Sequence, residues 1–264
     1  MAAFAEQWMI PLYFFFAVVG AAVGSFLNVC IWRLPQGTSI VRPSSHCPKC
    51  LHPIRFYDNI PVISYLLLRR KCRDCAERIS FRYPAVEIIT AAMALLIIWK
   101  FGFTAQALFA FLFTCALIVI TFVDLDHQII PDIITLPGIP LFFLISIFVM
   151  GLPLKDALLG LLIGGGCLYA VALAYELIAK REGMGGGDIK LLAMIGAFLG
   201  WRSLLFVLLT SSLLGAIVGI ALMIAKGRDM KYAVPFGPFL SVAAVAYLLI
   251  GEYAIRLFFS LRPY

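Results

Sequence analysis

Two groups of acidic residues lie beside long apolar runs in this sequence, where a carboxylate is costly to place. The first group follows the apolar run 115–123 and consists of Asp124, Asp126 and Asp132. The second is Asp188, which ends a glycine-rich segment immediately before another apolar run. An ionisable residue in or beside a membrane span indicates a functional site once local pairing has been excluded. Both groups therefore qualify as candidate sites.

Two carboxylates held close together are suited to acid–base catalysis. They cannot both ionise cheaply, so one keeps its proton while the other acts as a base toward water. This is the chemistry of aspartic proteases. Asp124 directly follows the apolar run and is expected to be the most desolvated acid of its group, which makes it the first choice as the partner of Asp188.

The glycines before Asp188 allow two interpretations. Gly185, Gly186 and Gly187 lack a Cβ, so they admit positive φ angles and let an extended peptide backbone approach the acid closely. The alternative is a flexible turn between two helices, with Asp188 as the N-cap of the second helix. The residue types alone do not decide between these interpretations.

Cysteines form a second kind of candidate site. Two C-x-x-C pairs present four thiols from tight turns, a spacing typical of a tetrahedral zinc site: Cys47, Cys50, Cys72 and Cys75. Four thiolates leave no open coordination position, so the zinc is expected to be structural. The alternatives are a redox pair or four free thiols, and His46 and His52 could compete as ligands.

The elements that position these residues are membrane-spanning helices. The chain has 264 residues, of which 63% are hydrophobic and only 13% are charged. A bilayer core about 30 Å thick needs roughly 20 apolar residues per helical crossing. The sequence predicts an all-α, polytopic protein with about eight spans, at 8–32, 84–100, 104–123, 133–150, 155–180, 189–201, 203–225 and 236–259.

Lysine and arginine predict the orientation of these spans. The loop 33–83 carries most of the basic residues, so the positive-inside rule places it in the cytoplasm. Counting crossings from this loop puts both acidic groups on the cytoplasmic side. The net charge of +7 then reflects topology and attraction to anionic lipid, with no nucleic-acid partner. The expected division is a first helix (1–32), a cytoplasmic cysteine loop (33–83) and a membrane core (84–264).

Several ordered segments resemble the prepilin peptidase family, also called type IV leader peptidases, within the G-x-G-D class of aspartic proteases. The matching segments are 24–35, 58–61, 82–87, 124–132, 183–190 and 235–238. The resemblance implies that Asp124 and Asp188 are the catalytic pair. It also implies a bacterial inner-membrane enzyme that removes short basic leaders from type IV prepilins or type II secretion pseudopilins at the cytoplasmic face.

The resemblance further implies a second activity. Bifunctional members of the family N-methylate the new N-terminal residue with S-adenosylmethionine, and a large cysteine-bearing loop is typical of them. No glycine-rich strand-turn-helix segment of the Rossmann type is present, so the cofactor site stays unassigned, with Glu87 as a candidate. Glu87 has no partner four residues away and lies one turn inside the second span.

Three other classes of protein share some of these features. Paired acids and glycine-broken helices also mark ion-coupled transporters, but here the acids lie at the membrane edge and no duplicated pair of broken spans is evident. A presenilin-like protease shares the G-x-G-D chemistry but lacks the cysteine loop. A non-catalytic zinc scaffold leaves both acidic groups unexplained.

Overall fold

The computed structural model describes residues 2–180, 185–226 and 234–260, and within these ranges it contains helices and no strands. Gly183 and Met184, which belong to the predicted glycine motif, lie outside the described residues. The chain divides into two compact units, Met1–Val119 and Ile120–Tyr264.

The N-terminal unit (Met1–Val119) is built on two long helices that pack against each other, α1 (Ala2–Arg33) and α3 (Arg82–Phe101). Glycines permit this packing, because a Cβ on Gly24 would lie 2.7 Å from Cα of Glu87, and one on Gly20 would lie 2.8 Å from Cα of Ala91. Small residues at a helix interface let two backbones approach closely in a membrane.

The segment between α1 and α3 contains only short helical elements. They are η1 (Leu34–Gln36), η2 (Phe56–Asn59) and α2 (Ile63–Leu67). The long helix α4 (Ala105–His127) begins in the N-terminal unit and ends in the next one.

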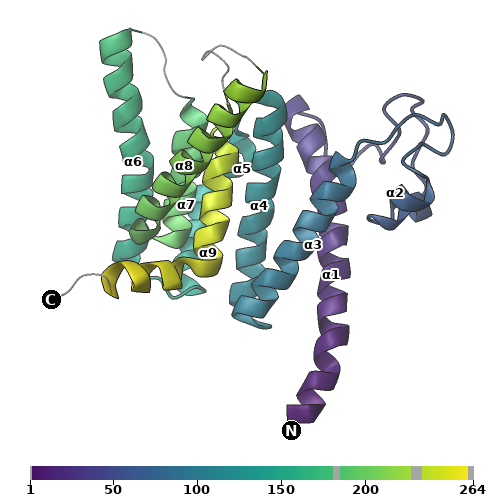
Figure 1. Ribbon diagram of the computed structural model, residues 1–264, viewed down its shortest axis with the longest axis horizontal. Coiled ribbons are helices and arrows are strands. Elements are labelled where there is room, and N and C mark those ends of the chain that lie inside the picture. The colour runs from purple at the N-terminus through teal and green to yellow at the C-terminus, as the bar shows by residue number, and fades with distance from the viewer. Residues whose placement is uncertain (1, 181–184, 227–233, 261–264) are drawn as a thin grey trace. The chain divides into compact units, whose positions relative to one another are not determined.

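The C-terminal unit (Ile120–Tyr264) is a helical bundle with α7 at its centre (Figure 1). Its helices are α5 (Asp132–Phe148), α6 (Leu154–Ala179), α7 (Gly186–Leu199), α8 (Trp201–Lys226) and α9 (Gly237–Ser260). Every residue from Leu191 to Phe198 is buried, because α7 packs against the other four helices. The backbones of α6 and α7 meet at Gly160 and Gly196, where a Cβ on either would lie 2.1 Å from the other's carbonyl oxygen.

Each of the eight predicted spans corresponds to one helix, and the chain is a multi-pass membrane protein. Five of the described helices are long and apolar enough to cross a bilayer by themselves: α1, α3, α4, α6 and α8. The expected number of eight full crossings is therefore not established. Helix α7 has 14 residues, which at the usual rise is about 21 Å and shorter than a bilayer core of about 30 Å.

One predicted boundary is wrong in a way that matters for chemistry. Helix α4 does not end with the apolar run at residue 123 but continues to His127, so Asp124 and Asp126 are helical. Residues i and i+2 of an α-helix are separated by about 200° around the helix axis, so they lie on nearly opposite faces. Accordingly Asp124 is buried, with 5% of its surface exposed, whereas Asp126 is exposed.

Candidate active site

Asp124 lies near the C-terminal end of α4 and is held by the start of α9. The backbone N–H of Gly237, the first residue of α9, donates a hydrogen bond of 3.0 Å to Oδ2 of Asp124. A helix N-terminus carries partial positive charge and unpaired N–H groups, so it favours an anion. This hydrogen bond therefore favours the ionised form of Asp124, relative to a carboxylate that is buried without a donor.

Asp188 has a different environment. It is the third residue of α7, and its Oδ1 atom is buried without a hydrogen-bond partner among the described residues. Asp188 lies outside the five candidate spans. Burial and the Asp124 carboxylate together raise the pKa of Asp188 to about 6. An acid with such surroundings favours its neutral, protonated form.

The described glycines before Asp188 adopt ordinary backbone conformations and do not use the positive φ angles that glycine admits. Gly185 is the N-cap of α7, with a φ of −66°, and Gly186 and Gly187 are helical. The alternative in which Asp188 is the N-cap of this helix is wrong, because Gly185 is the N-cap. The absence of a Cβ at Gly187 leaves room for the side chain of Ile130, because an added Cβ would lie only 2.8 Å from Cβ of Ile130.

Ile130 connects the starts of α7 and α9. Besides its contact at Gly187, its Cδ1 atom would lie 3.2 Å from a Cβ on Gly237. The same added Cβ would lie 2.6 Å from Oδ2 of Asp124. Glycine at both helix starts therefore lets α7 and α9 close around the Asp124 carboxylate and one isoleucine.

The remaining acids of the first group are arranged differently. Asp132, at the first position of α5, is exposed and receives hydrogen bonds of 2.7 and 2.8 Å from Nζ of Lys190, in the first turns of α7. Sequence reasoning assigned no role to Lys190 or Gly237. The segment 235–238 was among the matching motifs, but nothing local in it points to Asp124.

The four predicted cysteine ligands come together in the N-terminal unit. Their Sγ atoms all lie within 4.8 Å of one another, and those of Cys47 and Cys75 are 3.8 Å apart. A tetrahedral site with zinc–sulfur bonds of about 2.3 Å has sulfurs about 3.8 Å apart. The cluster could therefore hold a metal ion such as zinc.

Each cysteine pair forms the same kind of tight turn. The N–H of Cys47 donates to the carbonyl of His52 and that of Cys72 to the carbonyl of Glu77, at 3.0 and 2.8 Å. Backbone N–H groups also turn toward the sulfurs, and a hydrogen bond from Cys50 lowers the pKa of the Cys47 thiol to about 7. The thiolate is the metal-binding form of cysteine.

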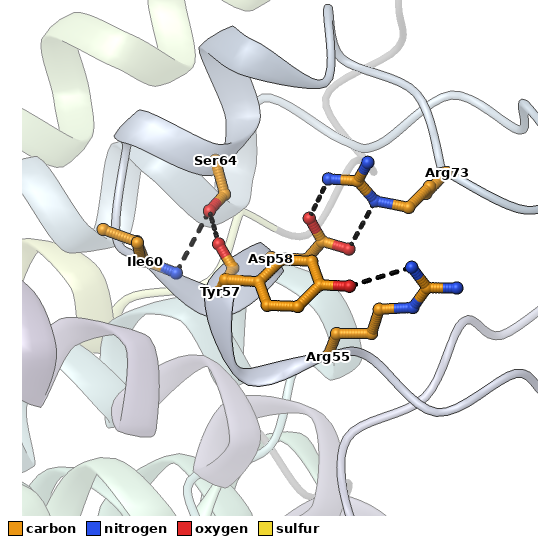
Figure 2. Close-up of polar contacts among 6 residues, drawn as sticks. All are labelled: Arg55, Tyr57, Asp58, Ile60, Ser64 and Arg73. Atoms are coloured by element: carbon orange, nitrogen blue, oxygen red, sulfur yellow. Dashed lines mark hydrogen bonds and ion pairs between the residues drawn. The ribbon is translucent and has the colours of Figure 1, made fainter.

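Polar contacts fix the segment between the two cysteine pairs (Figure 2). Arg73, which lies between Cys72 and Cys75, binds the carboxylate of Asp58 through two hydrogen bonds of 2.8 and 2.5 Å. Ser64 donates to the carbonyl of Tyr57 and accepts from the N–H of Ile60. These contacts join η2 and α2 to the second cysteine turn.

Glu87 lies in the same unit, on the first part of α3. It is buried, with 8% of its surface exposed, and its Oε2 atom accepts a hydrogen bond of 2.7 Å from the N–H of Val62. Its side chain lines a cavity of about 670 Å³. Cys47 and Cys72 line the same cavity.

Both parts of the chain are similar to known protein families. The Bacterial Peptidase A24 N-terminal domain matches residues 18–101, and the Type IV leader peptidase family matches residues 111–220. No solved structure matches the chain.

Similar proteins are called prepilin leader peptidase/N-methyltransferase. The protein from Pseudomonas aeruginosa is 39% identical, and the match covers 93% of this chain and 93% of that protein. The protein from Pseudomonas putida is 38% identical, and the match covers 92% of this chain and 93% of that protein. The one from Myxococcus xanthus is 42% identical over 83% of this chain and 67% of its own length. Identity of this extent along both units shows that the chain belongs to the type IV leader peptidase family.

Proposed function

We propose that this protein is a membrane aspartic endopeptidase that removes the basic leader of prepilins or pseudopilins, with Asp124 and Asp188 as its catalytic pair. The observation that carries this proposal is the unequal environment of the two acids. Asp124 accepts a hydrogen bond from a helix N-terminus, whereas Asp188 is partly buried with one oxygen unpaired among the described residues. Catalysis by a carboxylate pair needs one ionised and one protonated acid.

The two acids would divide the reaction between them. Asp124 takes a proton from water as the water oxygen bonds to the scissile carbonyl carbon, and Asp188 gives its proton to the carbonyl oxygen. Asp124 then returns its proton to the amide nitrogen as the carbon–nitrogen bond breaks, and Asp188 regains a proton from the collapsing intermediate. Both acids finish in their starting states.

The substrate would present a basic leader beside an apolar helix. We expect the leader to lie at the cytoplasmic face of a bacterial inner membrane and the apolar helix to lie in the bilayer. Asp126 is exposed close to Asp124 in sequence, and is suited to meet the positive charge of the leader.

We further propose that the protein methylates the new N-terminus with S-adenosylmethionine as the methyl donor. When bound, S-adenosylmethionine would supply the methyl group and leave as S-adenosylhomocysteine, and the amine that accepts the methyl group would release a proton to water. The proposed zinc would stabilise the loop 33–83 and would not take part in either reaction, because all four of its positions are filled by thiolates.

One experiment tests both activities. Purified protein is incubated with a pilin-like precursor, with and without S-adenosylmethionine, and the mass of the mature product is followed. We expect loss of the leader in both reactions and the added mass of one methyl group only with the methyl donor. An unchanged precursor would contradict the peptidase assignment, and cleavage without methylation would contradict the second activity.

A further inference from the structure

The cavity in the N-terminal unit is formed where the end of α1, the cysteine loop and the start of α3 meet. Its volume of about 670 Å³ falls within the range of about 300–1,000 Å³ that is usual for small-molecule sites. Aromatic side chains line it together with charged ones: Trp32, Arg33, Tyr65, Tyr83 and Glu87. All of its lining residues belong to the N-terminal unit, whereas Asp124 and Asp188 belong to the C-terminal unit.

Glu87 gives this cavity a negative charge that the surrounding protein compensates only weakly. Its hydrogen bonds within the described part of the chain come from uncharged groups, the backbone N–H of Val62 and the side chain of Ser25. A buried carboxylate is costly unless it is paired with a cation. Three other acids line the cavity, Asp58, Asp74 and Glu77, and two of them are already in ion pairs, Asp58 with Arg73 and Glu77 with Lys49.

The backbone that holds Glu87 is strained. Val62 has a φ of 60° and a ψ of −47°, a conformation that is a genuine outlier for a β-branched residue. In this conformation its N–H points to Oε2 of Glu87 at 2.7 Å. Strain of this kind persists where the surrounding structure imposes it, and it is concentrated at ligand sites.

Opposite charges are also available in the cavity. Arg33 is buried, and its guanidinium donates to the carbonyl oxygens of Ser39 and Pro43 through Nη1 and Nη2. A guanidinium has five N–H donors, so these two bonds leave others. The site therefore offers a carboxylate for a cation, a guanidinium for an anion, and aromatic rings for a base.

We infer that this cavity is the binding site of the methyl donor S-adenosylmethionine, with the Glu87 carboxylate opposite one of its two positively charged groups. S-adenosylmethionine carries a sulfonium, an ammonium, a carboxylate and an adenine ring, and the cavity has a complementary group for each. Aromatic rings bind both bases and cations. This inference rests on the proposed methylation and assigns a place to it.

The proposed zinc site contributes to the wall of the same cavity. Cys47 and Cys72 are among the lining residues, one from each cysteine pair. Their position joins the metal cluster to the cavity, since loss of the metal would free two segments of its wall. Metal removal is therefore expected to weaken binding of the methyl donor.

The test measures binding directly, with full-length protein in detergent. Equilibrium binding of S-adenosylmethionine is compared between wild type and Glu87→Gln, which keeps the shape and an acceptor for Val62 but removes the charge. The matched control is Thr90→Val, because Thr90 is buried on the next turn of α3 and does not line the cavity. We expect Kd to rise at least tenfold in Glu87→Gln and to stay within twofold in Thr90→Val, with metal content unchanged in both.

Photocrosslinking supplies a second measurement that needs no variant. Ultraviolet irradiation of wild-type protein with radiolabelled S-adenosylmethionine should label peptides within residues 25–87. Label only in the C-terminal unit, or equal affinity in wild type and Glu87→Gln, would overturn the site while leaving methylation intact. Wild-type protein that methylates nothing and binds no methyl donor would overturn both the inference and the methylation activity.

Discussion

The N–H of Gly237 donates a 3.0 Å hydrogen bond to the Asp124 carboxylate, although 113 positions separate the two residues. The bond joins the last turns of α4 to the first residue of α9. It gives one acid of the proposed pair a backbone N–H donor from another helix, whereas Oδ1 of Asp188 has no hydrogen-bond partner among the described residues. The relationship explains why two chemically identical side chains could take different roles.

The glycine at position 237 should be required for cleavage. A Cβ there would lie 2.6 Å from Oδ2 of Asp124, so Gly237→Ala should displace the carboxylate and break its hydrogen bond. A hydrogen bond to a charged group contributes about 1.5–3 kcal/mol, and we expect kcat/KM for precursor cleavage to fall about tenfold to a hundredfold.

A control for this substitution is Gly219→Ala in α8, where an added Cβ meets nothing within 4 Å. It should leave cleavage unchanged or stabilise the helix slightly. If Gly237→Ala cleaves as fast as Gly219→Ala, the hydrogen bond to Asp124 has no role in catalysis.

The rate of cleavage should depend on pH with a bell shape. Below the raised pKa of about 6, Asp188 carries the proton that it donates, and it loses this proton as the pH rises through that value. At strongly acidic pH, Asp124 takes up a proton and can no longer act as a base. We therefore expect kcat/KM to decrease on both sides, with the alkaline limb centred near pH 6.

Unfolding must be measured across the same pH range, because loss of structure would also lower the rate. Protein that stays folded but cleaves at the same rate from strongly acidic to neutral pH would contradict a titrating carboxylate pair.

Loss of the metal should affect the structure of the loop 33–83 more than it affects proteolysis. Purified protein should contain about one equivalent of zinc, the number for a single four-thiolate site. Cys72→Ser should release the metal and make the loop 33–83 more sensitive to protease, while precursor cleavage decreases less. Elemental analysis that finds no zinc in protein purified without chelator would contradict the site. Equal loss of loop order and of cleavage would give the metal a part in proteolysis.

The sequence predicted the helices and the metal cluster because both depend on local patterns. Eight apolar runs correspond to eight helices, and two C-x-x-C pairs determine two tight turns whatever the rest of the chain does. The end of α4 was not predictable in the same way. A helix continues through polar residues such as Asp124 and Asp126 when packing supports it, so the end of an apolar run is not the end of a helix.

The details of the candidate site depend on contacts between distant segments. The role of Gly187 is set by Ile130 and that of Gly237 by Asp124. In both cases the missing Cβ matters because another helix lies close, and no local pattern contains that information. The positive φ of Val62 was likewise not predictable, since valine alone disfavours it and its N–H bonds to Glu87, 25 positions away.

The ion pair between Lys190 and Asp132 should contribute little to stability and little to catalysis. Their side chains are 36% and 54% exposed, and an exposed ion pair contributes about 0–1 kcal/mol. Asp132→Asn should therefore retain substantial cleavage activity. If the pair positions α7, the double variant Asp132→Lys with Lys190→Asp should recover whatever either single reversal loses. A large loss that the double variant does not recover would instead indicate contact with the substrate.

Replacement of either acid by asparagine should abolish cleavage. Asparagine keeps the shape of aspartate and an acceptor oxygen, but it has no titrating proton. Asp124→Asn and Asp188→Asn should each be inactive while membrane insertion and metal content stay unchanged. The double variant should be no worse than either single variant, because residues that act as one unit are not additive.

The matched control for these replacements is Asp126→Asn, which lies on the same helix two positions from Asp124 and is exposed where Asp124 is buried. It should retain most of kcat, and any loss should appear as a higher KM for precursors with a strongly basic leader. An active Asp124→Asn with an inactive Asp126→Asn would show that the first acid is misassigned, although the class of enzyme would stand. Full activity in Asp188→Asn would contradict the carboxylate pair itself, because the Asp124 carboxylate contributes to the raised pKa of Asp188.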